Sequence, residues 1–325
     1  MNKKPLFIAA AFVVLCFAGL AFINSFIAEK IDDAISDQIR EIENESDVKM
    51  DYDDLRYNLL TTTMTLEDFE FIEDKDIIEV GTIDLKIGLG TLRTLSESGK
   101  DAALSDFTLT CYEMDAFVDR ESFEMAQGTI EYSGRISIKD QEFTIRSLRI
   151  ELEEFESHAE YMAFEVGHVL FYGDAGDDGL DFETISNMNE ASWIALRDIE
   201  LKTKISDLDL PIASTREMEL DEMGIETLLI YDLEFNANRI GDDLALFFAL
   251  DTDMAEGMLD CAVDFSKSES DPEMEIELSL NNLDKDIRKI LAKNVDWEKG
   301  RDEFEFEFSG LVSELPLALM ESVNP

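Results

Sequence analysis

Histidine is almost absent from this 325-residue chain, and its scarcity limits the chemistry that the chain can perform. The two histidines, His158 and His168, accompany no serine or cysteine nucleophile motif, and no G-x-S-x-G, H-E-x-x-H or C-x-x-C pattern occurs. Carboxylates are frequent, but among 75 acidic residues their proximity carries no information about a site. We therefore predict that the protein has no catalytic residue and no cofactor and is not an enzyme.

Cysteine is nearly as scarce, with three residues. Cys16 follows Leu15, whereas a lipidated cysteine needs a small residue before it, so a lipoprotein is excluded. For Cys111 and Cys261 two alternatives stay open. A disulfide between them would close a long loop and stabilise the fold by about 5 kcal/mol; otherwise both are buried free thiols.

Basic residues are few, 27 against 75 acidic ones, and the formal net charge is −48. Such a protein is repelled by nucleic acid phosphates and by anionic membrane surfaces, so we predict no nucleic acid partner. A salt-adapted protein can share this balance, but 22 phenylalanines indicate a full-strength apolar core. Proline is also scarce, with five residues, and no proline-rich linker marks a domain boundary.

The first 28 residues hold the strongest signal that is present. An unbroken apolar run covers residues 5–23 behind Lys3 and Lys4, and no acidic residue precedes Glu29. Nineteen helical residues extend roughly 28 Å, close to the thickness of a bilayer's hydrocarbon core. We predict a cytoplasmic stub and a single transmembrane anchor over residues 1–28, with residues 5–23 in the bilayer and the body outside the cytoplasm. A cleaved signal peptide ending near Gly19-Leu20-Ala21 is the alternative.

Behind the anchor the apolar pattern keeps a helical period. Isoleucines recur every three or four residues with charged residues between them, at Ile27, Ile31, Ile35, Ile39 and Ile42. We predict an amphipathic stalk helix over residues 29–45.

From Val48 onward the apolar period changes to two, which is typical of strands with one apolar and one acidic face. Most connections are too short for crossover helices, so residues 46–325 are predicted to form a mainly β body. Its antiparallel meander would make a curved sheet, a groove or a sandwich, with a few peripheral helices. One hairpin is expected to turn between Asn58 and Thr63, another at Asp140 and Gln141, and helices are expected over residues 182–196 and 285–293. Strands are expected at residues 80–89, 130–138, 199–205, 228–235, 244–250, 258–265, 274–280 and 304–308.

A short pattern recurs in this body: apolar, any residue, Asp or Asn, apolar, any residue, apolar. It occurs at residues 66–71, 104–109, 196–201 and 230–235 and, in degraded form, at 280–285. Its central residue interrupts the alternation, as a bulge or a tight turn would. A structural repeat is one interpretation, and chance recurrence in an acidic β protein is the other.

Two segments behind the membrane crossing, Tyr57–Phe71 and Thr82–Leu92, resemble the start of AsmA-like periplasmic proteins and the related YdgA-like family. The resemblance is best over residues 1–95, and beyond them it rests on the six-residue pattern and on residues 278–284. Here Thr61–Thr63 stand where a glycine is usual in that group. The resemblance implies a bacterial envelope protein anchored in the cytoplasmic membrane, with its body in the periplasm, and its larger members build long lipid-conducting grooves.

The function depends on what covers the apolar face of the sheet. An uncovered face would exceed the apolar area that monomers tolerate, so acyl chains or an envelope protein partner would fill it. The groove candidates are Ile83, Leu85, Ile87, Leu89, Ile130, Tyr132 and Ile136. If a second sheet covers the same side chains, the body is a sandwich and they form the dry core of a ligand-free scaffold or assembly factor.

One loop resembles the start of a calcium site. Asp174, Asp177 and Asp178 alternate with Gly176 and Gly179 in it. The twelfth loop position, where an EF-hand has glutamate, is Ile185 at the start of an expected helix. A polar turn that leads into that helix is the alternative interpretation.

Overall fold

The computed structural model describes most of the body and little of the N-terminal segment. The described residues are 36, 39–40, 43–44, 46, 48–58, 61–87, 104–119, 121–137, 142–159, 162–176, 179–181, 198–211, 227–268, 270–285, 287–289 and 301–318.

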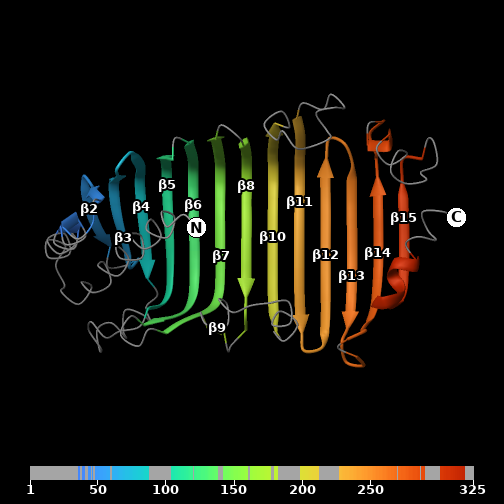
Figure 1. Ribbon diagram of the computed structural model, residues 1–325. Coiled ribbons are helices and arrows are strands. Elements are labelled where there is room, and N and C mark those ends of the chain that lie inside the picture. The colour runs from blue at the N-terminus through green and yellow to red at the C-terminus, as the bar shows by residue number, and fades with distance from the viewer. Residues whose placement is uncertain are drawn as a thin grey trace. The chain divides into compact units, whose positions relative to one another are not determined.

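Fifteen strands dominate these residues (Figure 1). They are β1 (Val48–Asp51), β2 (Asp54–Asn58), β3 (Thr63–Glu73), β4 (Asp76–Ile87), β5 (Leu104–Val118), β6 (Glu121–Ser137), β7 (Glu142–Ala159), β8 (Met162–Asp174), β9 (Leu180–Asp181), β10 (Ile199–Pro211), β11 (Thr227–Ile240), β12 (Asp243–Thr252), β13 (Glu256–Asp264), β14 (Glu273–Asn281) and β15 (Phe304–Leu311). A short 3-10 helix, Val312–Glu314, follows β15.

The strands pair in the order β1-β3-β4-β5-β6-β7-β8-β10-β11-β12-β13-β14-β15, with β2 on β3 and β9 on β7. Every ladder with a resolved register is antiparallel and most join consecutive strands, which confirms the predicted meander. All described strands belong to this one sheet, so the sandwich that the sequence left open does not occur among the described residues. A sandwich needs two sheets face to face.

The chain divides into two compact units. The N-terminal unit comprises residues 1–152 and 177–186, and the C-terminal unit comprises residues 153–176 and 187–325. The boundary falls within β7, after Leu152.

The N-terminal unit buries one face of its strands. Leu66 on β3 is 2% exposed and pairs with Ile83 on β4, which is 4% exposed. Val80 pairs with Met114 and is 1% exposed. The positions between these residues alternate to the opposite face, where Thr65 and Asp84 are hydrogen-bonded at 2.5 Å. The period of two read from the sequence therefore separates an apolar from a polar face in this unit.

The expected hairpin between Asn58 and Thr63 is present, because β2 and β3 pair across it. Thr62 lies in this turn with a φ of 56°, and its hydroxyl donates to the carbonyl oxygen of Ile87 at 2.6 Å. The left-handed conformation favours glycine, which is the residue expected there in the resembled family. The threonine hydroxyl instead ties the turn to the end of β4.

Most expected strands coincide with observed ones, from the strand at Ile199 to the one at Phe304. Two long strands, β5 and β8, were missed as complete elements. The turn at residues 140–141 and the helix at 182–196 lie outside the described residues. Residues 285 and 287–289 are helical, as expected at the start of the 285–293 helix.

The N-terminal predictions are described only in part. In the predicted stalk, residues 36, 39–40 and 43–44 are helical. Ile39 is 6% exposed, Ser36 and Tyr52 share a hydroxyl hydrogen bond of 3.1 Å, and Glu43 accepts one from the Met50 amide. Among the described residues no helix has the length and apolarity needed to span a bilayer. The predicted anchor over residues 1–28 lies outside them.

Candidate functional site

The structure brings most of the predicted groove residues together on one face of the N-terminal unit. Through the strand register, Leu85 on β4 is aligned with Leu109 on β5 and then with Ile130 on β6. Ile87 is aligned in the same way with Phe107 and Tyr132, while Ile83 and Ile136 extend the face along and across these strands. Leu89 lies outside the described residues. The spacing seen in the sequence thus predicted a shared face.

Ile83, Leu85, Ile87 and Tyr132 are closely covered, whereas Ile130 and Ile136 are half-buried. Leu85 and Ile87 are each 1% exposed, and Tyr132 is 6% exposed. The Tyr132 ring stacks on Phe107 at 5.1 Å, and its hydroxyl donates to the Thr144 carbonyl oxygen at 2.6 Å. Burial raises the pKa of the Tyr132 phenol to about 12. Such packing is typical of a protein core rather than of an open groove.

A second apolar face, more exposed than the first, belongs to the C-terminal unit and was not singled out in the sequence. Its central row runs Thr203, Phe235, Phe248, Leu259, Leu278, Phe306 from β10 to β15. We call this face of β10–β15 the C-terminal strip. Its other central members are Leu201, Ala237, Leu246, Cys261, Ile276 and Phe308 in one row, and Ile205, Leu233, Leu250, Gly257, Leu280 and Phe304 in another.

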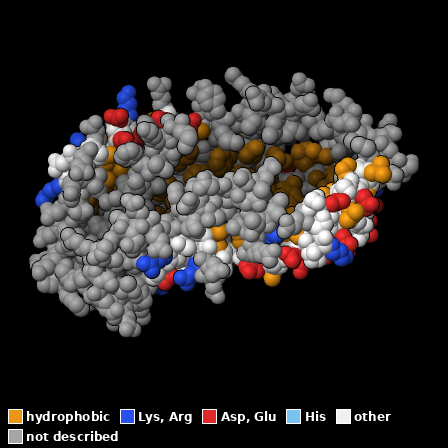
Figure 2. All heavy atoms as spheres, turned by 60° about the horizontal axis from the view of Figure 1, so that its bottom comes forward, with side chains coloured by type: hydrophobic (Ala, Val, Ile, Leu, Met, Phe, Trp, Pro, Cys, Tyr) orange, Lys and Arg blue, Asp and Glu red, His pale blue; other side chains and the backbone are white. Residues whose placement is uncertain are grey.

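Most side chains of the C-terminal strip are half-buried, including Leu246, Phe248 and Leu259. Only a minority, such as Phe304 and Phe306 at 6% each, are buried. Figure 2 shows hydrophobic side chains gathered in a hollow where this unit is drawn, with acidic side chains on the outer side. The strip is therefore an apolar surface that other apolar groups can still reach.

The opposite face of the same strands is polar and strongly acidic. Asp260, Glu277 and Glu307 stand directly opposite one another on β13, β14 and β15, and all three are exposed. Like charges in this arrangement repel. A shallow depression of about 760 Å³ also lies on this face, over Ala245 and Ala262, with acidic residues around it. The two faces of the unit thus differ sharply in chemistry.

The two described cysteines are free thiols, so the disulfide alternative is not realised. Cys111 is 8% exposed beside Ile83, and Cys261 is 5% exposed in the C-terminal strip. Burial raises the pKa of the Cys111 thiol to about 12 and also raises that of Cys261. Both behave as small apolar residues.

The calcium candidate is described only at Asp174, because Asp177 and Asp178 lie outside the described residues. One Asp174 oxygen accepts the Gly176 amide at 2.7 Å, and the other accepts the Tyr172 hydroxyl at 3.1 Å. This is the geometry of a polar turn whose carboxylate binds its own loop.

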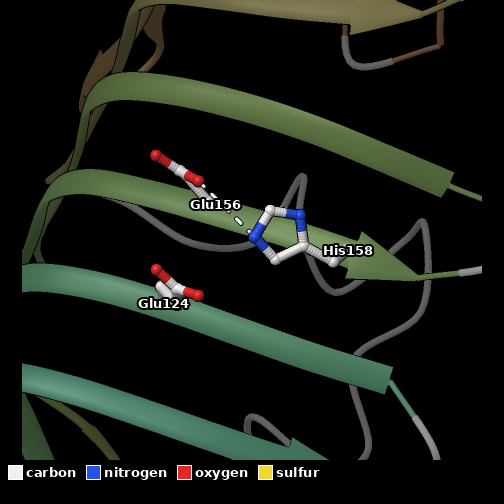
Figure 3. A group of neighbouring side chains, drawn as sticks. All are labelled: Glu124, Glu156 and His158. Carbon is white, nitrogen blue, oxygen red and sulfur yellow. Dashed lines mark ion pairs between the residues drawn. The ribbon is translucent and has the colours of Figure 1, made fainter.

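Both histidines lie on strands. In Figure 3, His158 and Glu156 lie on β7, with 3.5 Å between the imidazole Nε2 and the carboxylate Oε2, and Glu124 lies on β6. The exposed side chains of His158 and Glu156 form a surface ion pair when the imidazole is protonated. Glu124 belongs to the N-terminal unit and the pair to the C-terminal unit, so we assign no site to the three together.

The candidate site thus rests on the chemistry of the two apolar faces. No known protein family, curated protein or solved structure matches this chain. The resemblance to AsmA-like proteins therefore stays a prediction from the sequence.

Proposed function

We propose that this is a non-enzymatic, membrane-anchored envelope protein of AsmA-like type, which holds lipid acyl chains on the C-terminal strip. One observation carries the proposal: six consecutive strands present a continuous apolar face whose large side chains are mostly half-buried. Six strands at about 4.8 Å spacing, each contributing every second residue of a stretch of about six, make a face of roughly 24 by 20 Å.

The energy available on such a face is large. Each methylene group that leaves water gains about 0.8 kcal/mol, so an acyl chain of a dozen or more carbons can repay the cost of being ordered. This hydrophobic interaction is not directional, so a sheet surface of leucine, isoleucine and phenylalanine accepts acyl chains of differing length. No residue needs to perform chemistry in this function.

The predicted membrane anchor and the C-terminal strip have complementary roles in this proposal. An apolar run over residues 5–23 would keep the body beside the cytoplasmic membrane, which is the source of acyl chains. The acidic opposite face, with Glu277 among its residues, resists contact with anionic headgroups. Lipid would therefore meet the protein on the apolar face.

Native mass spectrometry of the detergent-extracted full chain tests the function. We expect phospholipid to co-purify with the wild type and to be lost from Leu259→Asp, which places a carboxylate in the central row of the strip. Met258→Asp is the matched control, because Met258 neighbours it on β13, points to the opposite face and is 42% exposed. Lipid-free wild type with a cooperative thermal transition would contradict the proposal.

A second function, that of a ligand-free scaffold or assembly factor, is favoured by the N-terminal unit. Its apolar face is closed, with Leu66, Val80, Leu85 and Ile87 all nearly inaccessible. In this alternative the C-terminal strip is covered by an envelope protein. Wild-type protein that repeatedly purifies without lipid, together with an envelope protein cross-linked to the strip, would favour the scaffold.

A further inference from the structure

A single charged residue lies on the C-terminal strip. Among the described residues of β10–β15 that share this face, every member is apolar, glycine or threonine except Arg239. Arg239 pairs with Ile199 on one side and with Leu244 on the other, in the row where β11 turns into β12. A cation in this place has no counterpart elsewhere on the strip.

Arg239 is 8% exposed, yet its guanidinium is barely satisfied. Its Nε donates to the Gly241 carbonyl oxygen at 3.2 Å, and its Cζ lies 4.9 Å from the centre of the Phe265 ring. Nη1 and Nη2 donate to no residue that the structure describes, and no described carboxylate forms an ion pair with them. Among the described residues the only buried side-chain nitrogen or oxygen without a partner is Asp209 Oδ1, so the Nη groups of Arg239 reach solvent, from where an anion can approach them.

The geometry points to the phosphate group of a phospholipid as the partner of Arg239. This inference rests on the proposed function and deepens it, because it assigns the headgroup end of the strip. A guanidinium offers parallel N–H donors that match two phosphate oxygens. Stacking on Phe265 fixes the plane of the donors, and the acyl chains would lie along the rows that lead away from Arg239.

The charge of the body bears on which headgroup fits. Asp198 accepts a hydrogen bond of 3.3 Å from the amide of Gly241, the same residue whose carbonyl oxygen accepts from Arg239. With a net charge of −48, the protein disfavours a headgroup that is negative as a whole. A zwitterionic headgroup avoids this repulsion and still offers its phosphate to the guanidinium. We therefore choose dioleoylphosphatidylethanolamine as the probe, and dioleoylglycerol as the matched lipid without phosphate.

Arg239→Gln isolates the charge, because glutamine can still donate to the Gly241 oxygen. Arg301→Gln is the matched control: Arg301 also donates Nε to a backbone oxygen, that of Glu303 at 2.7 Å, and stacks on Phe304 at 5.4 Å, but it precedes β15. Both variants and Arg239→Lys are made in the full chain, delipidated in detergent and titrated with each lipid by native mass spectrometry.

We expect Arg239→Gln to weaken phosphatidylethanolamine binding about 10- to 100-fold, the usual effect of losing charge-assisted hydrogen bonds. Dioleoylglycerol binding should stay unchanged, Arg301→Gln should resemble the wild type, and Arg239→Lys should keep part of the affinity. A thermal melt checks that each variant is folded. If Arg239→Gln does not fold, Arg239→Lys replaces it in the comparison with the wild type.

Three results would overturn the inference while the proposed function stands: equal wild-type affinity for the two lipids, unchanged phosphatidylethanolamine binding in Arg239→Gln, or equal loss of both lipids. Displacement of the phospholipid by inorganic phosphate alone would also overturn it, since the anion site would then be independent of the strip. Binding of neither lipid by the wild type would instead refute the proposed function.

Discussion

Replacing Leu85 by aspartate tests whether the apolar face of the N-terminal unit is a core or a groove. The two possibilities differ in what surrounds this side chain. Leu85 is 1% exposed and lies between Met64 on β3 and Leu109 on β5. In a groove the new carboxylate would meet a ligand channel and the unit would stay folded. In a core it would meet only carbon, and the unit would unfold.

The cost in a core can be worked out in parts. Losing the burial of a leucine removes about 2 to 3 kcal/mol, and an unpaired buried carboxyl costs about 1 to 3 kcal/mol even when protonated. Keeping that carboxyl protonated at pH 7, from an ordinary pKa near 3.9, costs up to about 4 kcal/mol more. The sum, about 7 to 10 kcal/mol, is comparable to the whole stability of a typical domain.

The cost of keeping the buried carboxyl protonated depends on pH, and this dependence distinguishes a core from a groove. Below the ordinary aspartate pKa both states are protonated, so about 4 kcal/mol of the destabilisation should disappear at acidic pH. Leu85→Asn, which carries no titratable group, should show the smaller penalty at both pH values. Lys86→Asp, on the same strand and exposed on the other face, is the control and should change stability little.

Urea unfolding followed by far-UV circular dichroism, with limited proteolysis to locate the opened segment, measures these differences. The two units can unfold in separate transitions, so each is fitted by itself. A Leu85→Asp variant that is as stable as Lys86→Asp at pH 7 would refute the reasoning. The predicted groove residues of the N-terminal unit would then be accessible after all.

Three further predictions follow from the described contacts. Gly167→Ala should destabilise the C-terminal unit by about 1 to 3 kcal/mol, because a Cβ there would lie 3.0 Å from the Asp207 Cβ; Asp207→Gly should rescue it in a double-mutant cycle of urea midpoints. In a Cys16→Ser background, iodoacetamide at pH 8 should leave Cys111 unmodified until denaturant is added, because a pKa of about 12 leaves roughly one thiolate in 10⁴. The free energy of unfolding should decrease between about pH 9 and 12, because the Cys111 thiol stays protonated in the folded state and ionises near pH 9 in the unfolded state. This group alone lowers the free energy of unfolding by about 1.4 kcal/mol per pH unit, so the decrease with pH should be less steep in Cys111→Ala.

Much of the fold was predictable because alternation of apolar and polar residues is a local signal. The strands from Leu244 to Phe308 keep one parity over their whole length, and all were located to within a few residues. The hairpin at Asn58 to Thr63 followed from the same signal. Pairing between distant residues, such as the alignment of Phe235 with Phe248, is not local and needed the structure.

The long strands β5 and β8 were missed for a physical reason. In β5 the apolar face carries Leu109 and Cys111, then Met114 and Ala116, so odd positions give way to even ones. In β8 the face carries Val166 and then Val169. Strict alternation ends at each such change, so the sequence pattern does not indicate that the residues on its two sides form one long strand.

The candidate site was also only partly readable. The groove candidates share a face, as their spacing implied, but a period of two does not say whether that face is covered. Leu85 and Leu259 each lie in a stretch of alternating apolar and polar residues, yet Leu85 is 1% exposed and Leu259 is half-buried. Arg239 gave no signal, because one basic residue at the end of a strand normally faces water.

The changes of parity described above in β5 and β8 fall at Glu113 and Gly167, whereas the change in β3 falls at Asp68, the central residue of one hexamer. Asp68 in β3 has a φ of 52° and is left out of the pairing between Glu67 and Phe69, opposite Gly81. Asp207 in β10 has a φ of 55° and is left out in the same way, opposite Gly167. An aspartate tolerates this left-handed conformation better than most residues.

The partner strand leaves out its glycine at the same place, so the register does not shift, and in both strands the residues on the two sides keep their apolar side chains on one face although their numbers change parity. Four of the hexamers found in the sequence carry their central residue at a positive φ or beside a register shift: Asp68, Asp106, Asp198 and Asp232; the degraded one has Asn282 at 54°. Asp68, Asp106 and Asp232 lie inside β3, β5 and β11, whereas Asp198 and Asn282 lie just outside β10 and β14, so the hexamer marks irregular backbone without forming one repeated element. Within β3, β5 and β11 the change of parity keeps the apolar side chains on one face, and β11 is the one of these strands that belongs to the C-terminal strip.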